Sequence, residues 1–81
     1  MRSLRILATD EEGTLQRTIF EFSRRNIPIG RLMYSHEKDS VTMHIGVERD
    51  EDVNRVLKHL NRIYGVRDVS ILENEEVREK W

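Results

Sequence analysis

The chain has 81 residues, no cysteine, and a formal net charge of −1 from 14 Lys and Arg against 15 Asp and Glu. The lack of cysteine excludes disulfides and thiolate metal sites, and the balanced charge argues against a nucleic-acid binder that neutralises phosphates. A chain this short forms one domain with a thin core, so stabilisation by association is expected. We expect a cytoplasmic protein, because no apolar run approaches the ~18 residues of a membrane span and the N-terminus lacks the apolar core of a signal peptide.

A strand followed by a helix opens the chain. An apolar run predicts the strand over about residues 3 to 9. Apolar residues then recur at helical spacing, which predicts a helix from Gly13 to Arg25. The inward-facing side chains of this helix are expected to be Leu15, Ile19 and Phe22. Either Thr9 or Asp10 is expected to cap its N-terminus.

The joint between these two elements reads TDEEGTL, residues 9 to 15. A helix start gathers backbone N–H groups, and glycine lets another molecule approach the backbone closely. The same stretch therefore fits either a plain turn or an anion-binding site. The paired carboxylates Asp10 and Glu11 are more typical of a solvated turn or a helix-start charge than of a catalytic pair.

Two strands joined by a polar turn come next. Residues 27 to 35 contain the second expected strand, with Gly30 at a bulge or a close contact. Residues 36 to 40 read as a polar turn. Apolar and polar residues then alternate over residues 41 to 47, which predicts a third strand with one buried and one polar face.

A second helix and a last strand complete the pattern. From residue 53, apolar residues repeat at i, i+3, i+4, i+7, i+10 and i+11, which predicts an amphipathic helix that ends at Gly65 in C-cap position. These residues are Val53, Val56, Leu57, Leu60, Ile63 and Tyr64. Residues 66 to 71 predict the last strand. A single domain over residues 1 to 73 is therefore expected, followed by a charged tail at residues 74 to 81.

The order strand, helix, strand, strand, helix, strand predicts an α+β fold. Its length suits a ferredoxin-like βαββαβ domain, with a four-stranded antiparallel sheet and two helices on one face. Acylphosphatases, RNA-recognition modules, metal chaperones and amino-acid sensors share this fold, so the residues of the site must decide between them.

Three of these classes lack their residues here. A metal chaperone needs soft ligands in the first loop, which offers only Asp10, Glu11 and Glu12. An RNA-recognition module needs aromatic residues on its central strands, and residues 41 to 46 contain none. An acylphosphatase-like enzyme needs an arginine and backbone amides around a phosphate, whereas this loop is acidic.

The three histidines do not form a site either. His36 is expected in a turn, His44 on a polar strand face and His59 on a helix exterior. No second ligand or nucleophile stands at motif spacing from them, so solvated surface positions are the interpretation, with no catalytic and no metal-binding residue.

The stretch LATDEEGTLQRTIFEFSRRNIPIGRLM resembles the ACT domain, a small ligand-binding regulatory module. The ACT signature is an apolar strand, then Asp or Asn, two residues, often with proline second, then Gly and Leu, with NI entering the second strand. Asp10, Gly13 and Leu15 match this signature.

Two further runs, residues 22 to 25 and residues 60 to 69, resemble the small regulatory subunit of acetolactate synthase. In that family FSRRGFNI follows the first helix, and LNKLxDVxxV joins the second helix to the last strand. The resemblance covers about residues 3 to 72. A second C-terminal domain is absent from this sequence, so the chain looks most like the short isozyme II type, which supports the catalytic subunit with little response to valine.

The resemblance implies a non-catalytic subunit for branched-chain amino-acid biosynthesis. Such a subunit docks on the large, thiamine-diphosphate-dependent subunit of acetolactate synthase and raises its activity. It carries no cofactor itself, and neither nucleic acid nor a membrane is expected as a partner. ACT domains pair edge to edge through their second strands, so a homodimer is expected.

The same resemblance implies an effector site for a branched-chain amino acid such as valine. It would lie between the first loop of one subunit and the second-strand entrance of its mate. Carried over residue by residue, the loop contributes Asp10, Gly13, Thr14 and Leu15, and the mate contributes Ile29. Helix-start amides would hold the carboxylate, and an acidic residue the ammonium.

Two positions depart from the family pattern. Pro28 stands where the family has an asparagine whose side chain meets the effector, and Glu12 stands where proline is frequent. Proline has neither an amide side chain nor a backbone N–H, so docking on a catalytic partner is favoured over effector binding. The alternatives are a stand-alone ACT sensor serving another enzyme and, with less support, an acylphosphatase-like enzyme.

Overall fold

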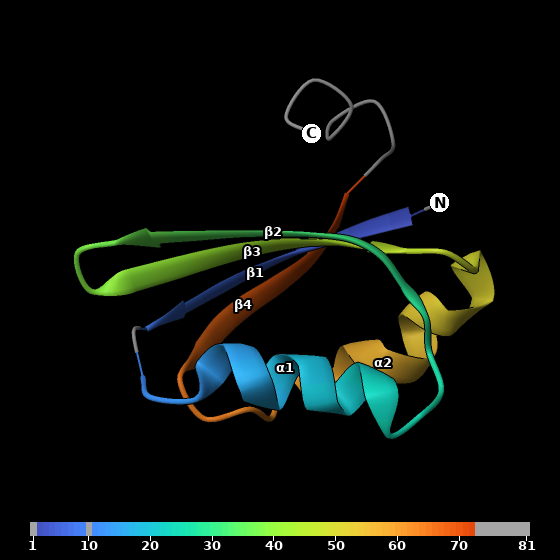
Figure 1. The fold of residues 1–81 in the computed structure, drawn as a ribbon, viewed down its shortest axis with the longest axis horizontal. Helices are drawn as coiled ribbons and strands as arrows, with labels where there is room; N and C mark the ends of the chain where they lie inside the picture. Colours follow the sequence, from blue (N-terminus) through green and yellow to red (C-terminus); the bar gives the residue numbers. More distant parts are fainter. Residues whose placement is uncertain (1, 10, 73–81) are drawn as a thin grey trace.

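A four-stranded antiparallel sheet carries two helices on one face (Figure 1). The computed structural model describes residues 2–9 and 11–72, and the predicted charged tail lies outside the described residues. In chain order the elements are β1 (Arg2–Thr9), α1 (Thr14–Ser23), β2 (Ile29–Glu37), β3 (Ser40–Val47), the short helix η1 (Asp50–Asp52), α2 (Val53–Leu60) and β4 (Val66–Leu72). The strand order β2-β3-β1-β4 confirms the predicted ferredoxin-like α+β fold.

The core lies between the sheet and the helices. Side chains on the central strands β1 and β3 alternate between the two faces of the sheet, so one apolar row of each strand faces the helices. In these rows Leu4 lies opposite Ile45, and Ile6 lies opposite Met43. The fully buried side chains that fill it are Leu4, Ile6, Ala8, Phe22, Val41, Met43, Ile45, Val47, Val53, Val56 and Leu60. Burial of each side chain larger than alanine in this set contributes about 1.5–3 kcal/mol, which makes this layer the main source of stability.

Helix α1 buries a different stripe from the predicted one. Thr14, Thr18 and Phe22 are its buried residues, whereas Ile19 is 37% exposed, so the inward facing predicted for Ile19 is wrong. The two threonines can be buried because their hydroxyls are satisfied: Thr18 Oγ1 donates to the Thr14 carbonyl oxygen at 2.8 Å. The helix also ends at Ser23, two residues before the predicted Arg25.

The hairpin of β2 and β3 confirms one prediction and corrects two. The register shifts between Ile29 and Arg31, so Gly30 does lie at a bulge. His36 belongs to β2 and not to the turn, which is confined to residues 38 and 39. His44 is only 8% exposed, because it lies on a central strand between Arg5 and Met33, and its predicted solvation is wrong.

Helix α2 is shorter than its apolar pattern. It ends at Leu60, and its C-cap is Asn61 in right-handed conformation, so Gly65 is not the predicted C-cap. Gly65 does adopt a left-handed conformation with φ +91°, but in the turn that enters β4. Ile63 stays buried in that turn, whereas Tyr64 is 72% exposed instead of facing the core. A turn breaks the helical period after residue 60, which explains the difference.

Candidate effector-binding site

The loop between β1 and α1 is a tight hydrogen-bonded turn. The Glu11 N–H donates to the Thr9 carbonyl oxygen at 2.9 Å. The Glu11 carbonyl oxygen in turn accepts from the Thr14 hydroxyl at 2.8 Å and from the Thr14 N–H at 3.2 Å. Because Thr14 is buried and occupied in this way, it shapes the loop and does not present its hydroxyl to a ligand.

Gly13 is the N-cap of α1 and has a left-handed backbone with φ +84°. No side chain of the described residues caps the helix, so Thr9 is not the predicted cap, and Asp10 lies outside the described residues. A Cβ built on Gly13 would lie 3.7 Å from Cζ of Arg17, one helical turn further on. The start of α1, which no side chain of the described residues caps, therefore has a guanidinium group near its N-cap, a combination suited to a carboxylate.

A second loop fixes the first one in place. The Thr9 N–H donates to the Gly65 carbonyl oxygen at 2.8 Å, and Thr9 Oγ1 lies 3.2 Å from Oε2 of Glu11. A Cβ on Gly65 would lie only 2.9 Å from Thr9 Oγ1 and from Cγ of Glu11. The turn before β4 thus touches the β1–α1 loop, and the carboxylate of Glu11 is directed toward Thr9.

The predicted site residues do not meet within one chain. Thr9, at the loop, pairs with Ser40, and Ser40 pairs with Glu37 at the end of β2. Ile29 pairs with Val47 at the opposite end of the sheet (Figure 1). Gly13 and Thr14 therefore lie at one end and Ile29 at the other. Leu15 and Ile29 are both partly buried against the core, which leaves only part of each side chain for a ligand.

A hollow of about 240 Å³ lies at the end of the sheet where Thr9 pairs with Ser40. Its lining residues come from all four strands or their ends: Leu7, Ala8, Ser35, Glu37, Ser40, Val41, Thr42 and Arg67. Gly13, Thr14, Leu15 and Ile29 do not belong to that lining, and Asp10 lies outside the described residues.

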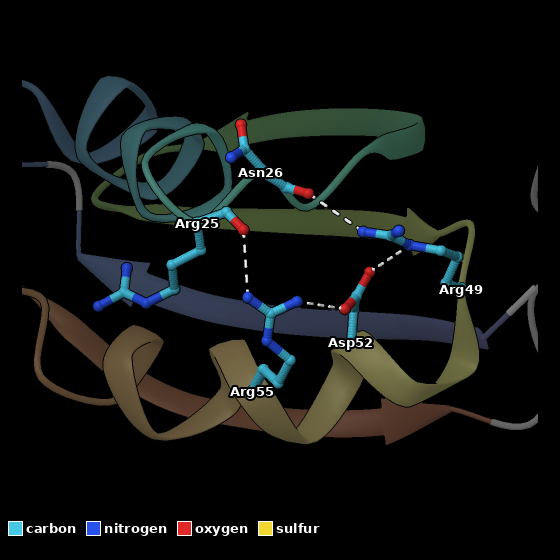
Figure 2. Close-up of polar contacts among 5 residues, drawn as sticks. All are labelled: Arg25, Asn26, Arg49, Asp52 and Arg55. Carbon is cyan, nitrogen blue, oxygen red and sulfur yellow. Dashed lines mark hydrogen bonds and ion pairs between the residues drawn. The ribbon is translucent and has the colours of Figure 1, made fainter.

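A polar cluster fixes the entrance of β2, on the side of Ile29 (Figure 2). The carboxylate of Asp52 accepts from Nε of Arg49 and from a guanidinium nitrogen of Arg55, both at 2.7 Å. The same two arginines donate to the carbonyl oxygens of Asn26 at 3.1 Å and Arg25 at 3.2 Å. The connection from α1 to β2 is thereby tied to η1 and α2.

The charge of Asp52 is stabilised in the fold. Its side chain is 2% exposed, and this burial by itself would raise the pKa of the carboxyl group. Hydrogen bonds from Arg55 and Arg49, together with their positive charges, outweigh burial and hold the pKa of Asp52 below its ordinary value. Asp52 is therefore an ionised anchor at neutral pH.

Sequence reasoning missed the roles of Arg17, Gly65 and Asp52. Arg17 stands at i+4 from Gly13, and a residue at this spacing covers the preceding helical turn, so its position was a usable signal. Gly65 acts through contacts with Thr9 and Glu11, far away in the sequence, so no local pattern indicates its role. The partners of Asp52 stand at i−3 and i+3, so this spacing of opposite charges was a usable local signal.

The described residues contain neither a three-residue group for a metal ion nor a membrane-spanning helix. Over residues 2–9 and 11–72 the structure contains no group of three His, Asp or Glu side chains able to hold a metal ion. In that same part of the chain no helix is long and apolar enough to cross a membrane.

Comparisons with known proteins give a likeness of fold. No family model and no curated protein sequence matches the chain. The crystal structure of the ACT domain from GTP pyrophosphokinase of Chlorobium tepidum is similar with a TM-score of 0.75 and 18% sequence identity, over 88% of this chain and 95% of that one. The ligand-free regulatory subunit of aspartate kinase from Thermus thermophilus is similar with a TM-score of 0.73 and 13% identity, over 90% of this chain and 50% of that one. The chain thus has the fold of an ACT domain.

Proposed function

We propose that the chain is a regulatory subunit whose ACT fold binds an amino acid between two copies. We further propose that it serves the large subunit of acetolactate synthase, on which it docks and whose activity it raises. The observation that carries the proposal is the start of α1, where the left-handed Gly13 lies beside the guanidinium of Arg17 and no side chain of the described residues caps the helix. This arrangement suits the carboxylate of an amino acid.

The second half of the site comes from a mate. When two identical strands pair antiparallel, the start of one lies beside the end of the other. Pairing through β2 would therefore bring Ile29 of the partner subunit toward Glu37 and the β1–α1 loop, since both lie at one end of the sheet. The branched side chain of valine would pack against that isoleucine. Pro28 offers no amide to such a ligand, so docking on the catalytic subunit is the main role and effector binding the secondary one.

Conformations in the two family-like runs support acetolactate synthase as the partner. The run FSRRGFNI has glycine where this chain has Asn26, and Asn26 adopts the left-handed φ of +54° that glycine adopts readily. The second run, residues 60 to 69, buries Leu60 and Ile63, which stand where LNKLxDVxxV has its leucines, whereas Gly65 stands where that run has aspartate.

A stand-alone sensor that serves another enzyme is the second candidate. The observation in its favour is the fold likeness to regulatory parts of GTP pyrophosphokinase and aspartate kinase. Calorimetry with each of the twenty amino acids separates the two. A stand-alone sensor binds one amino acid tightly and leaves the rate of the large acetolactate synthase subunit unchanged, whereas the proposed docking subunit raises that rate and binds an amino acid only weakly.

The edge strand β2 is the expected dimer interface. Among the described residues β2 pairs only with β3, so its outer edge offers free backbone groups. Leu32 and Tyr34 lie on its helix-facing side and are 39% and 43% exposed. We expect light scattering at tens of micromolar to give twice the 9.7 kDa of one chain.

Leu32→Lys is expected to weaken this dimer about tenfold or more, because it buries a charge at the edge-to-edge contact. Ser35→Lys is the matched control, since Ser35 is exposed on the opposite face of the same strand. Sedimentation at several concentrations gives both dissociation constants. A monomeric wild type, or equal effects of the two substitutions, would contradict pairing through β2.

Gly13→Asp tests the loop as a binding site. The new carboxylate would compete with an effector carboxylate for Arg17 and the helix amides, so we expect valine affinity to fall at least tenfold. The left-handed φ of Gly13 also predicts a loss of about 1 kcal/mol in stability. Gly13→Ala carries the same backbone strain without the charge, so it serves as the control in calorimetry. Unchanged affinity in the folded fraction of Gly13→Asp would mean that the loop is only a joint.

A further inference from the structure

A basic groove lies between the end of α1 and the outer face of α2, separate from the proposed amino-acid site. It is largely open to solvent, has a volume of about 480 Å³ and is lined by Arg25, Asn54, Arg55, Lys58 and His59. Three of these side chains are cationic at neutral pH, one is titratable, and none of the five is apolar. The chain as a whole has a net charge of −1, so the groove is more basic than the chain on average, with Glu21 and Asp52 paired to Arg25 and Arg55.

The two arginines of the groove are held in position, and Figure 2 shows the contacts of Arg55. Arg55 pairs with Asp52 at 2.7 Å and donates to the Arg25 carbonyl oxygen at 3.2 Å. Arg25 forms an ion pair with Glu21 and donates to its carbonyl oxygen at 3.0 Å. Both guanidinium groups therefore lie between the two helices before any ligand arrives, which lowers the entropy cost of binding.

The pKa of His59 depends on the charges around the groove. Its pKa is lowered first by burial and then by the positive charges of Arg25, Lys58 and Arg62, with Glu21 as the opposing charge. The imidazole is therefore uncharged at neutral pH, and a bound anion would raise its pKa again.

We propose that this groove binds an oligophosphate, either free or as the diphosphate part of a nucleotide. Guanidinium and ammonium groups that converge on one concave surface match several linked phosphate oxygens, and Arg binds such oxygens in bidentate geometry. An acidic protein segment fits less well, because stable protein interfaces have an apolar core and the five lining residues provide none.

Calorimetry and NMR on the full chain test the proposal with inorganic pyrophosphate, orthophosphate and ADP. Pyrophosphate is expected to bind at least tenfold more tightly than orthophosphate, because its second phosphate reaches a further cation. The pKa of His59 is expected to rise on binding, so affinity increases as the pH falls through that pKa. Equal binding of ADP and pyrophosphate assigns recognition to the diphosphate, whereas tighter binding of ADP adds the nucleoside to the ligand.

Lys58→Gln should weaken pyrophosphate about tenfold. The control is Arg67→Gln, which removes the same charge from a residue that lines a different hollow. Equal effects of the two variants, or binding that leaves His59 unshifted, would overturn the proposal in favour of general charge attraction. Binding of a poly-glutamate peptide at His59 with no response to pyrophosphate would overturn it in favour of an acidic protein partner.

Discussion

Gly65→Ala is expected to lower the free energy of unfolding by about 2–4 kcal/mol. Part of this loss comes from the left-handed φ of +91°, which an alanine adopts only at a cost. The rest comes from a Cβ placed 2.9 Å from both Thr9 Oγ1 and Cγ of Glu11, so that the two loops must move apart. The change thus loosens the β1–α1 loop from the turn before β4.

The matched control for this substitution is Gly13→Ala. Gly13 has a similar φ of +84°, but the atom nearest to a Cβ there is Cζ of Arg17 at 3.7 Å, an ordinary contact. We therefore expect a loss of only about 1 kcal/mol. Urea denaturation of both variants measures the difference. Equal losses would mean that contact between the loops contributes nothing to stability.

Asp52→Asn is expected to lower the melting temperature by about 5 °C or more at neutral pH. The amide cannot carry the charge that attracts Arg49 and Arg55, and it loses an acceptor that is buried in the fold. With the two arginines released, the carbonyl oxygens of Asn26 and Arg25 lose donors, and the entrance of β2 is no longer tied to α2.

The effect of this substitution should depend on pH in a defined direction. The pKa of Asp52 is lower in the folded than in the unfolded chain, so its stabilisation is present above the unfolded pKa of about 3.9 and is lost as the pH falls through the folded value. Melting curves of wild type and Asp52→Asn should therefore differ at pH 7 and converge in acid. The control is Asp68→Asn, because Asp68 is exposed and accepts a hydrogen bond from the nearby Ser70. A difference that persists below the folded pKa would contradict the ion-pair account.

The elements of the fold were predictable because they follow from local periodicity. Alternation over residues 41 to 47 and the apolar pattern from residue 53 specify a strand and a helix whatever surrounds them. Gly30 at its bulge could be predicted for the same reason, since glycine inside a strand marks irregular pairing.

The errors arise where tertiary contacts override hydrophobicity. Thr14 and Thr18 look polar in the sequence, yet hydroxyl bonds to the preceding turn let them occupy the buried face that Ile19 was expected to fill. His44 looks like a surface residue, yet two neighbouring strands cover it. Tyr64 fits the apolar spacing of a helix, but helix α2 ends at Leu60.

The candidate site was predictable only in part. Gly13 could be identified because glycine directly before a helix often adopts a left-handed backbone conformation, and Gly13 does adopt one. The separation of Gly13 from Ile29 follows from strand register, which no single-sequence pattern specifies. Both the site completed by a second copy and the choice of effector come from the resemblance, and the register adds that Gly13 and Ile29 of one chain lie too far apart to form the site alone.

Reconstitution with the catalytic subunit tests the central claim most directly. The large acetolactate synthase subunit from the same genome is purified with and without this chain, and its rate is measured at saturating thiamine diphosphate. We expect the two chains to co-purify and the rate to rise, with Leu32→Lys reducing the activation and Ser35→Lys preserving it. A large subunit that neither binds the chain nor changes its rate would contradict the assignment.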